Sequence, residues 1–233
     1  GLFGGTQDAR DDLIGGPDPD CLLSADDNDL DRAPEDALLH FVNWDRQWTD
    51  LEIETMDKGF AWLQLIRGNP ALLKTEGENV ITFERIGSLN GSLADNDSKG
   101  KIRVADAGFS NSITPDATIV HEIGHNWDTE MGGWFTDNWL PRSGWRPADN
   151  GGGSKFPPPG YLRSQDGQWD YLATAPFART YGTTNAREDW STAWEAYYVN
   201  LSYPFGDGAR SNHNYTGMLP KFEVVAQFFA GLF

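Results

Sequence analysis

The segment TIVHEIGHNWD, residues 118–128, is the feature of this chain that most restricts its fold. His121 and His125 are four residues apart, and on an α-helix such positions lie on one face with Cβ atoms about 5–6 Å apart. Thr114 and Pro115 are a typical N-cap and first-position pair, so they predict where this helix begins. The segment therefore predicts a helix that presents two imidazoles side by side.

Two imidazoles on one helix face, with a glutamate next to the first, are typical of a zinc site. Zn²⁺ in catalytic sites takes three protein ligands and keeps a fourth position open. His121 and His125 would be two ligands, and Glu122 is placed to take a proton from a water molecule that the ion activates. The alternative is a helix that simply buries two histidines, because the five-residue pattern also occurs by chance. His40 and His213 have no partner pattern and are expected at the surface or in ordinary hydrogen bonds.

A third ligand is not found close to this helix in the sequence. Asp128 and Met131 stand where a metzincin has glycine and histidine, which excludes that class. No glutamate lies between Glu130 and Glu188, which excludes a thermolysin-like ligand about 20 residues after the motif. The remaining candidate ligands are Glu188, Glu195, Glu223 and Asp170.

The pattern Tyr-Gly-x-Thr-Asn-x-x-Glu, residues 181–188, carries a resemblance to a known family. It resembles the segment that leads into the ligand helix of glutamate-liganded zincins (gluzincins), the family of the anthrax lethal factor peptidase domain. The similarity covers the HEIGH helix and roughly residues 178–198. It implies a zincin-like α+β fold, with the HExxH helix, a small mixed or antiparallel sheet and a second helix that carries the third ligand.

The same resemblance implies a role for each matching residue. Zinc would be bound by His121, His125 and Glu188. Glu122 would be the catalytic base, and Tyr181 would donate a hydrogen bond to the oxyanion of the tetrahedral intermediate. The resemblance thus implies a zinc-dependent metalloendopeptidase.

The chain departs from this family at one position. The family usually has a second acid four residues after the ligand glutamate, where it orients the first histidine, and this chain has Thr192 there. A carboxylate normally fixes the tautomer of a ligand histidine. Taken alone, Glu195 is more typical of an exposed acid on a helix surface. The sequence leaves open which acid replaces the missing one, and the candidates are Asp128, Asp189 and Glu195.

Hydrophobic periodicity and stop signals predict further elements. They are a helix capped by Thr49 and stopped by Gly68 and Pro70, strands over residues 79–86 and 101–107, and helices over residues 184–200 and 219–233. Strands that precede helices without βαβ alternation favour the α+β class.

Residues 131–180 contain many Gly, Pro and Trp residues and have no clear period. They predict a long irregular excursion, and excursions of this length in compact domains are usually functional. Tryptophans are dense here and are expected to pack the excursion against the body of the domain, at Trp127, Trp134, Trp139, Trp145 and Trp169. Alternatively, they line a cleft for an apolar or carbohydrate substrate.

Residues 1–31 differ from the rest of the chain because they are rich in Gly and Asp. The stretch DDLIGGPDPDCLL approximates the nine-residue repeat of calcium-binding β-rolls and resembles the end of an RTX-type array, with Asp18 and Asp20 as candidate Ca²⁺ ligands. Such an array needs about three stacked repeats, so the alternative is a flexible acidic linker. We therefore expect an RTX-like remnant or linker over residues 1–31 and a catalytic domain over residues 32–233.

Charge and composition exclude several classes of partner. The chain has 18 Lys and Arg against 35 Asp and Glu, and its net charge of −17 argues against nucleic acid. No apolar run approaches the roughly 18 residues of a membrane span. The single cysteine, Cys21, cannot form an intrachain disulfide. The start GLFGGTQDAR has no initiator Met, and we expect a monomeric, secreted or cell-surface bacterial protein released from a larger precursor.

Two functions from different classes remain. The first is zinc-dependent hydrolysis of a protein or peptide substrate. The second is a non-catalytic, metal-binding adhesion or matrix-binding module of a larger bacterial surface protein, which the RTX-like start and Thr192 would fit.

Overall fold

A computed structural model describes residues 39–67, 70–73, 75, 80–110, 114–130, 132–148, 156–204 and 207–231. Helices and strands are mixed along this part of the chain, consistent with the α+β class. None of the helices in these ranges is long and apolar enough to cross a membrane. The RTX-like segment, with Asp18 and Asp20, lies outside the described residues.

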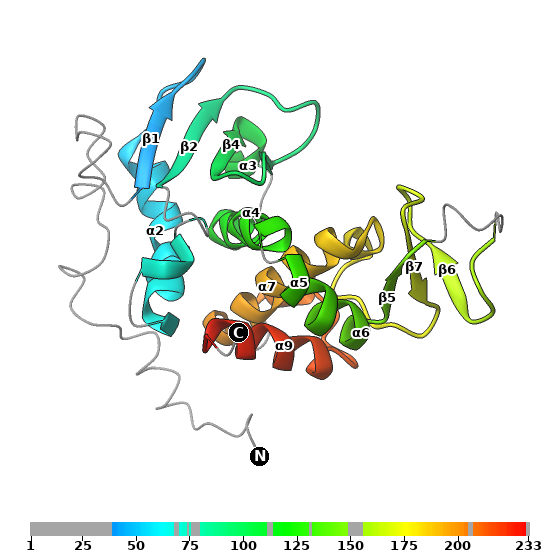
Figure 1. Cartoon of the computed structure of the whole chain (residues 1–233). Coiled ribbons are helices and arrows are strands. Elements are labelled where there is room, and N and C mark those ends of the chain that lie inside the picture. The colour runs from blue at the N-terminus through cyan, green and yellow to red at the C-terminus, as the bar shows by residue number, and fades with distance from the viewer. Residues whose placement is uncertain are drawn as a thin grey trace.

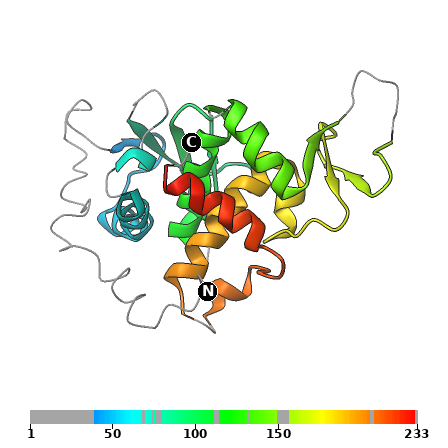
Figure 2. The ribbon, with the colours of Figure 1, turned by 60° about the horizontal axis from the view of Figure 1, so that its bottom comes forward.

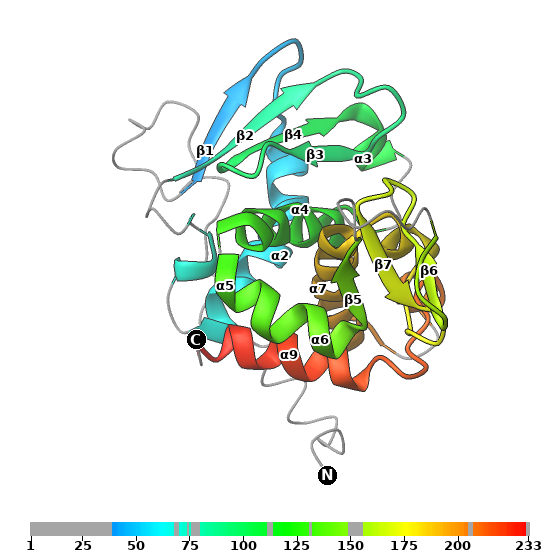
Figure 3. The ribbon, with the colours of Figure 1, turned by 45° about the vertical axis from the view of Figure 1, so that its right-hand side comes forward.

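A mixed four-stranded sheet forms one layer of the molecule (Figure 3). Its strands are β1 (Leu39–Asn43), β2 (Ile81–Ile86), β3 (Ala94–Asn96) and β4 (Lys101–Ala105). The order is β1-β2-β4-β3, with β1, β2 and β4 parallel and β3 antiparallel at one edge. Alternate side chains of β2 are buried, because only one face of the sheet packs on the core.

The helix predicted after Thr49 is α2 (Asp50–Arg67), and it begins with a capping box. The Thr49 hydroxyl accepts a hydrogen bond from the backbone N–H of Glu52 at 3.3 Å, and the Glu52 carboxylate accepts one from the N–H of Thr49 at 3.1 Å. A short 3-10 helix, Pro70–Leu73, follows. Because β1 and β2 are parallel and α2 connects them, the expectation of no βαβ alternation is wrong here. β1 was missed because it is a short strand of five residues without a strong pattern.

The helix that contains both histidines, α4 (Pro115–Glu130), lies beneath the sheet and follows the short helix α3 (Asp106–Ser110). It packs against α2 on one side and against α7 (Ala186–Ser202) on the other. A Cβ on Gly124 would lie 3.1 Å from the Ser191 hydroxyl and 3.3 Å from the Ser191 Cα. Glycine at this position therefore lets α4 and α7 approach closely enough to share one site.

The helix predicted at the end of the chain is α9 (Leu219–Phe229), which follows the short helix α8 (Gly208–Ser211). Figure 2 shows α9, in red, crossing α7, in orange. Phe228 of α9 lies within 5.6 Å of the ring centroids of Trp190 and Trp194 of α7, so aromatic packing joins the two helices. Phe228 also lies 5.6 Å from the ring centroid of Trp127 of α4, so this aromatic cluster joins α4, α7 and α9.

The excursion is more regular than the sequence predicted. Its described elements are α5 (Gly132–Trp134), a π-helical turn (Phe135–Trp139), α6 (Leu140–Ser143), and the strands β5 (Trp145–Pro147), β6 (Tyr161–Arg163) and β7 (Trp169–Leu172). The strands form an antiparallel sheet of order β5-β7-β6 that projects from the helices (Figures 1 and 2). Strands of three or four residues are too short for periodicity to reveal. Trp139 and Trp145 are buried in the core, as expected for residues that pack this region onto the body.

Candidate metal centre

Three side chains from two helices meet at one point. The Nε2 atoms of His121 and His125 lie 3.4 and 3.3 Å from the same oxygen, Oε2 of Glu188. One ligand atom from each residue lies within 4.8 Å of the others, which makes this group able to hold a metal ion. The Glu188 oxygen is buried and, apart from these two contacts with the histidines, has no hydrogen-bond partner among the described residues. Two imidazoles and one carboxylate are a donor set that suits Zn²⁺.

Local sequence explains why Glu188 reaches this point. The side chain of Asn185 caps α7 and accepts hydrogen bonds from the backbone N–H groups of Arg187 and Glu188, both at 2.9 Å. The cap fixes the first turn of α7, on which Glu188 faces α4. Thr180–Thr183 forms a 3-10 turn immediately before this cap and carries Tyr181.

The charged side chains at this point shift one another's pKa values. Burial lowers the pKa of His121, but the carboxylates of Glu188 and Glu195 outweigh it and raise the pKa to about 9. Burial also opposes protonation of His125, yet Asp128 and Glu188 raise its pKa to about 10. Burial raises the pKa of Glu188, but the two histidines reverse this and hold it well below its usual range. A cation bound here would take the place of the two protons.

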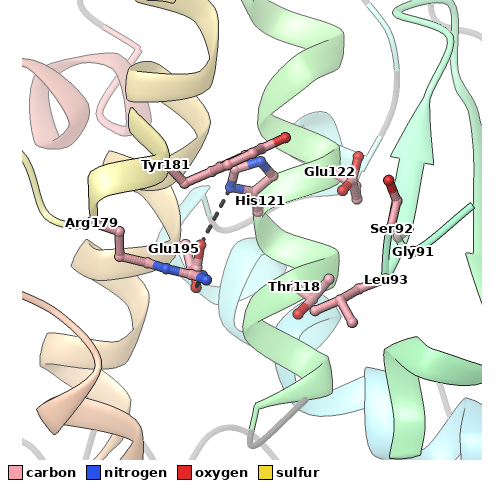
Figure 4. Close-up of a pocket in the computed structure, with 10 residues that line it drawn as sticks. Gly91, Ser92, Leu93, Thr118, His121, Glu122, Arg179, Tyr181 and Glu195 are labelled. Atoms are coloured by element: carbon pink, nitrogen blue, oxygen red, sulfur yellow. Dashed lines mark hydrogen bonds and ion pairs between the residues drawn. The ribbon is translucent and has the colours of Figure 1, made fainter. Parts of the chain in front are cut away.

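Each of the two histidines faces a second carboxylate on the side away from Glu188. Oε2 of Glu195 lies 3.3 Å from Nδ1 of His121 (Figure 4), and Oδ2 of Asp128 lies 2.7 Å from Nδ1 of His125. Such contacts fix the ring orientation and leave Nε2 for the ion. Of the three acids that were candidates to orient a histidine, Glu195 therefore lies beside His121 and Asp128 lies beside His125.

The other two residues considered for this role lie elsewhere. The carboxylate of Asp189 is buried against the ammonium group of Lys221, with a closest distance of 2.6 Å. Thr192 is fully buried, and its hydroxyl has no hydrogen-bond partner in the described ranges.

Glu195 is itself held by two residues that sequence reasoning missed. Its Oε1 lies 2.6 Å from a guanidinium nitrogen of Arg179 and 3.1 Å from Nε2 of His213. Burial raises the pKa of Glu195, but His121 and His213 outweigh it and keep the carboxylate charged. Its side chain is only 4% exposed, so the expectation of an exposed acid is wrong. No spacing rule links these residues, because separate segments bring Arg179 and His213 to α7.

Glu122 and Tyr181 lie on either side of the metal-binding group. Glu122 is buried, and its burial raises the carboxyl pKa against the opposing effect of the two histidines. Tyr181 is about half exposed, with its ring centroid 6.0 Å from that of His121 (Figure 4). Its burial and the nearby carboxylates of Glu188 and Glu122 raise its pKa, so the phenol stays protonated and can donate a hydrogen bond.

Two hollows of about 250 Å³ each open onto these residues. Both are lined by His121, Glu122 and Tyr181, and both include residues of β3 and the loop before it. A wider hollow of about 780 Å³ continues beyond Arg179 and Tyr181. One of the two smaller hollows extends along α4 towards Thr118, and the other extends towards Asp128, so open space lies on both of these sides of the candidate centre.

The other acids considered as third ligand do not join the two histidines. Asp170 lies on β7, where its carboxylate is 2.6 Å from Arg163. Glu223 is exposed on α9. Among the described residues, the group that could hold a metal ion contains Glu188 as its one acid.

The segments that make this site are distant in the sequence, and α4 and α7 bring them together. Comparisons of the chain with protein-family models, with curated proteins and with solved structures gave no match.

Proposed function

We propose that this protein is a zinc-dependent metalloendopeptidase. The observation that carries the proposal is the convergence of one buried oxygen of Glu188 on the Nε2 atoms of both His121 and His125, at 3.4 and 3.3 Å. Without a metal, protons on the two histidines balance this carboxylate, and a cation held between the three ligands would take their place. Zn²⁺ bound there would supply a Lewis acid that polarises a carbonyl group and lowers the pKa of water.

Glu122 supplies the proton transfers of this reaction. Its carboxylate lies beside the candidate ligands without belonging to them, and its raised pKa brings it closer to the working range of a general base. In its ionised form it takes a proton from the attacking water. It then delivers that proton to the amine that leaves when the peptide C–N bond breaks.

Tyr181 supports the reaction from the other side of His121. Its protonated hydroxyl donates a hydrogen bond to the oxygen that becomes negative when water attacks the carbonyl carbon. Losing one donor of this kind typically lowers kcat by about 100- to 1000-fold. Because the hollows extend on both sides of the site, a substrate chain can continue past the scissile bond in both directions.

The first experiment measures metal content and hydrolysis together. Purified chain should carry one zinc per molecule and cleave a peptide library with a reproducible sequence preference, and a chelator should abolish the cleavage. Chain without stoichiometric zinc contradicts the proposal. Zinc binding without cleavage would favour the metal-binding adhesion module instead.

The Glu122→Gln variant tests the base separately from the metal. Glutamine has nearly the same shape but cannot accept the proton from water, so activity should fall by several orders of magnitude, on the order of 10²–10⁴-fold for general base catalysis alone. Zinc content should be unchanged, because Glu122 is not part of the ligand group. A variant that keeps wild-type activity removes Glu122 from this role.

A further inference from the structure

Edge strand β3 forms one wall of the space around the candidate centre. It pairs with β4 on one side, and its other side pairs with no strand in the described part of the chain. Ser92, just before β3, lines both hollows and lies close to Glu122 in Figure 4. Ala94 also lines both hollows, and Asn96 lines one of them. A peptide bound in these hollows would lie between β3 and the candidate metal ligands. The distance between β3 and α4 would then set the position of the peptide.

Two asparagines span this gap. The Asn96 side-chain amide donates hydrogen bonds to the backbone carbonyl of Glu122 at 2.5 Å and to Oδ1 of Asn126 at 2.8 Å. Asn126 directly follows the second histidine of the motif and is fully buried. Its Oδ1 also accepts a hydrogen bond from the backbone N–H of Gly100, in the β3–β4 turn, at 3.2 Å. The edge strand and its turn are thus attached to the helix turn that carries the base.

These hydrogen bonds fix the orientation of both side-chain amides. Oδ1 of Asn126 faces two donors, so a flipped amide would place nitrogen against nitrogen. Oδ1 of Asn96 accepts a hydrogen bond from the N–H of Ser98 at 2.6 Å, which fixes its amide in the same way. Gly100 also packs closely on Thr75, since a Cβ at Gly100, whose φ is +92°, would lie 2.7 Å from Thr75 Cγ2. The two asparagines therefore link β3 and the β3–β4 turn to α4 through three hydrogen bonds.

We infer that Asn96 and Asn126 are positioning residues that set the distance between the edge strand and Glu122. This inference rests on the proposed function. Neither side chain belongs to the metal ligand group. Both act on the peptide through other atoms: Asn96 through the position of β3, and Asn126 by anchoring Asn96 to α4. Their loss should displace the substrate relative to the base and leave the ion in place.

Asn96→Asp is the sharpest test of the pair. It keeps the size of the side chain and the acceptor for Ser98, but it places a carboxylate oxygen where the donor was. That oxygen would face the Glu122 carbonyl and Oδ1 of Asn126 and push β3 away from α4. We expect kcat/KM to fall by about 100-fold, the loss that a displacement of about 1 Å produces. Asn96→Ser, which removes both hydrogen bonds without this repulsion, should show a smaller loss.

Two inhibitors separate strand position from metal binding. Acetohydroxamate reaches only the ion, whereas a tripeptide hydroxamate also occupies the hollows beside β3. In Asn96→Asp the tripeptide hydroxamate should bind more weakly by about the same factor as kcat/KM falls, about 100-fold, while acetohydroxamate binding and zinc affinity stay unchanged. Equal weakening of both inhibitors, or of neither, overturns the inference.

Controls keep the result interpretable. Asn138→Ala removes an amide-to-carbonyl hydrogen bond of the same kind, to Trp134 at 3.0 Å, and should leave the affinities for both inhibitors unchanged.

A double variant tests whether the two asparagines act together. The losses of kcat/KM in Asn96→Ala and Asn126→Ala should be clearly non-additive in the double variant, because both substitutions break one connection. Additive losses contradict the pair. If wild-type chain binds zinc but cleaves nothing, the proposed function fails, and the inhibitor affinities still test the pair. Chain that holds no zinc overturns both.

Discussion

At the scale of single residues, each ligand histidine uses its two ring nitrogens differently. Nε2 of His121 and of His125 faces Glu188, while each Nδ1 faces a carboxylate, Glu195 for the first ring and Asp128 for the second. A carboxylate in this position makes the imidazole a better ligand and holds its orientation. Glu195 is one of the three acids that the sequence left as candidates for orienting a histidine, and it lies 3.3 Å from Nδ1 of His121.

Glu195→Gln tests this role. Glutamine keeps the shape but loses the charge, so His121 should bind zinc less strongly, by about 10- to 100-fold, and activity should fall with it. Competition with a chelator of known zinc affinity measures the effect. Thr192→Val is the matched control, since the buried Thr192 hydroxyl has no hydrogen-bond partner within the described ranges. Equal zinc affinity in Glu195→Gln and wild type would contradict an orienting role.

At the scale of elements, the site depends on how α7 is fixed. The carboxylate of Asp189, the residue after the candidate ligand Glu188, lies 2.6 and 2.9 Å from the ammonium of Lys221 on α9. It also accepts a hydrogen bond from the indole of Trp145 on β5 at 2.8 Å. Both charged side chains are 1% exposed. One buried ion pair therefore joins the ligand helix to the last helix and to the small antiparallel sheet.

Lys221→Met tests the ion pair. The variant leaves the carboxylate of Asp189 buried without its cation, and breaking a buried pair in this way typically costs about 3–5 kcal/mol. Urea denaturation should show this loss in the free energy of unfolding. The double variant Lys221→Met/Asp189→Leu should recover part of it, because no buried charge remains. A single variant as stable as wild type would show that the pair contributes little.

At the scale of the whole molecule, the candidate centre joins α4, which lies beneath the sheet, to α7 (Figure 3). A metal held by both helices is bound by the folded chain and not by the unfolded one. It should stabilise folding by about 4 kcal/mol when its free concentration is 1,000 times its Kd. Thermal unfolding with added zinc and with excess chelator measures this. An unchanged melting temperature contradicts a site shared by the two helices.

The metal-free molecule should also lose stability as pH rises. Nearby carboxylates raise the pKa of His121 to about 9 and that of His125 to about 10, above the value of about 6.5 in an unfolded chain. Their protonation therefore stabilises the fold fully below about pH 6.5, and this contribution is lost as pH rises through 9 and 10. Urea denaturation of the metal-free chain from pH 6.5 to 10.5 checks this. The His121→Asn/His125→Asn double variant should show a weaker pH dependence, and equal slopes would contradict it.

Local patterns predicted the elements that carry the site. The cap at Thr114 and the four-residue spacing of His121 and His125 predicted helix α4, because a helix needs only information within a few turns. The cap and periodicity at Thr49 predicted α2 in the same way. The strands β1, β3, β5, β6 and β7 were missed because three to five residues give too little pattern.

The sequence by itself determined the pair of histidines, the glutamate between them and a short set of acids that could complete the group. Only the tertiary structure decided that Glu188 meets both imidazoles, that Glu195 and Asp128 each face one of them, and that Asn96 ties the edge strand to α4. Spacing within a helix follows from local geometry, whereas contacts between α4, α7 and β3 depend on how side chains of distant segments pack. No local pattern in the sequence marks such contacts.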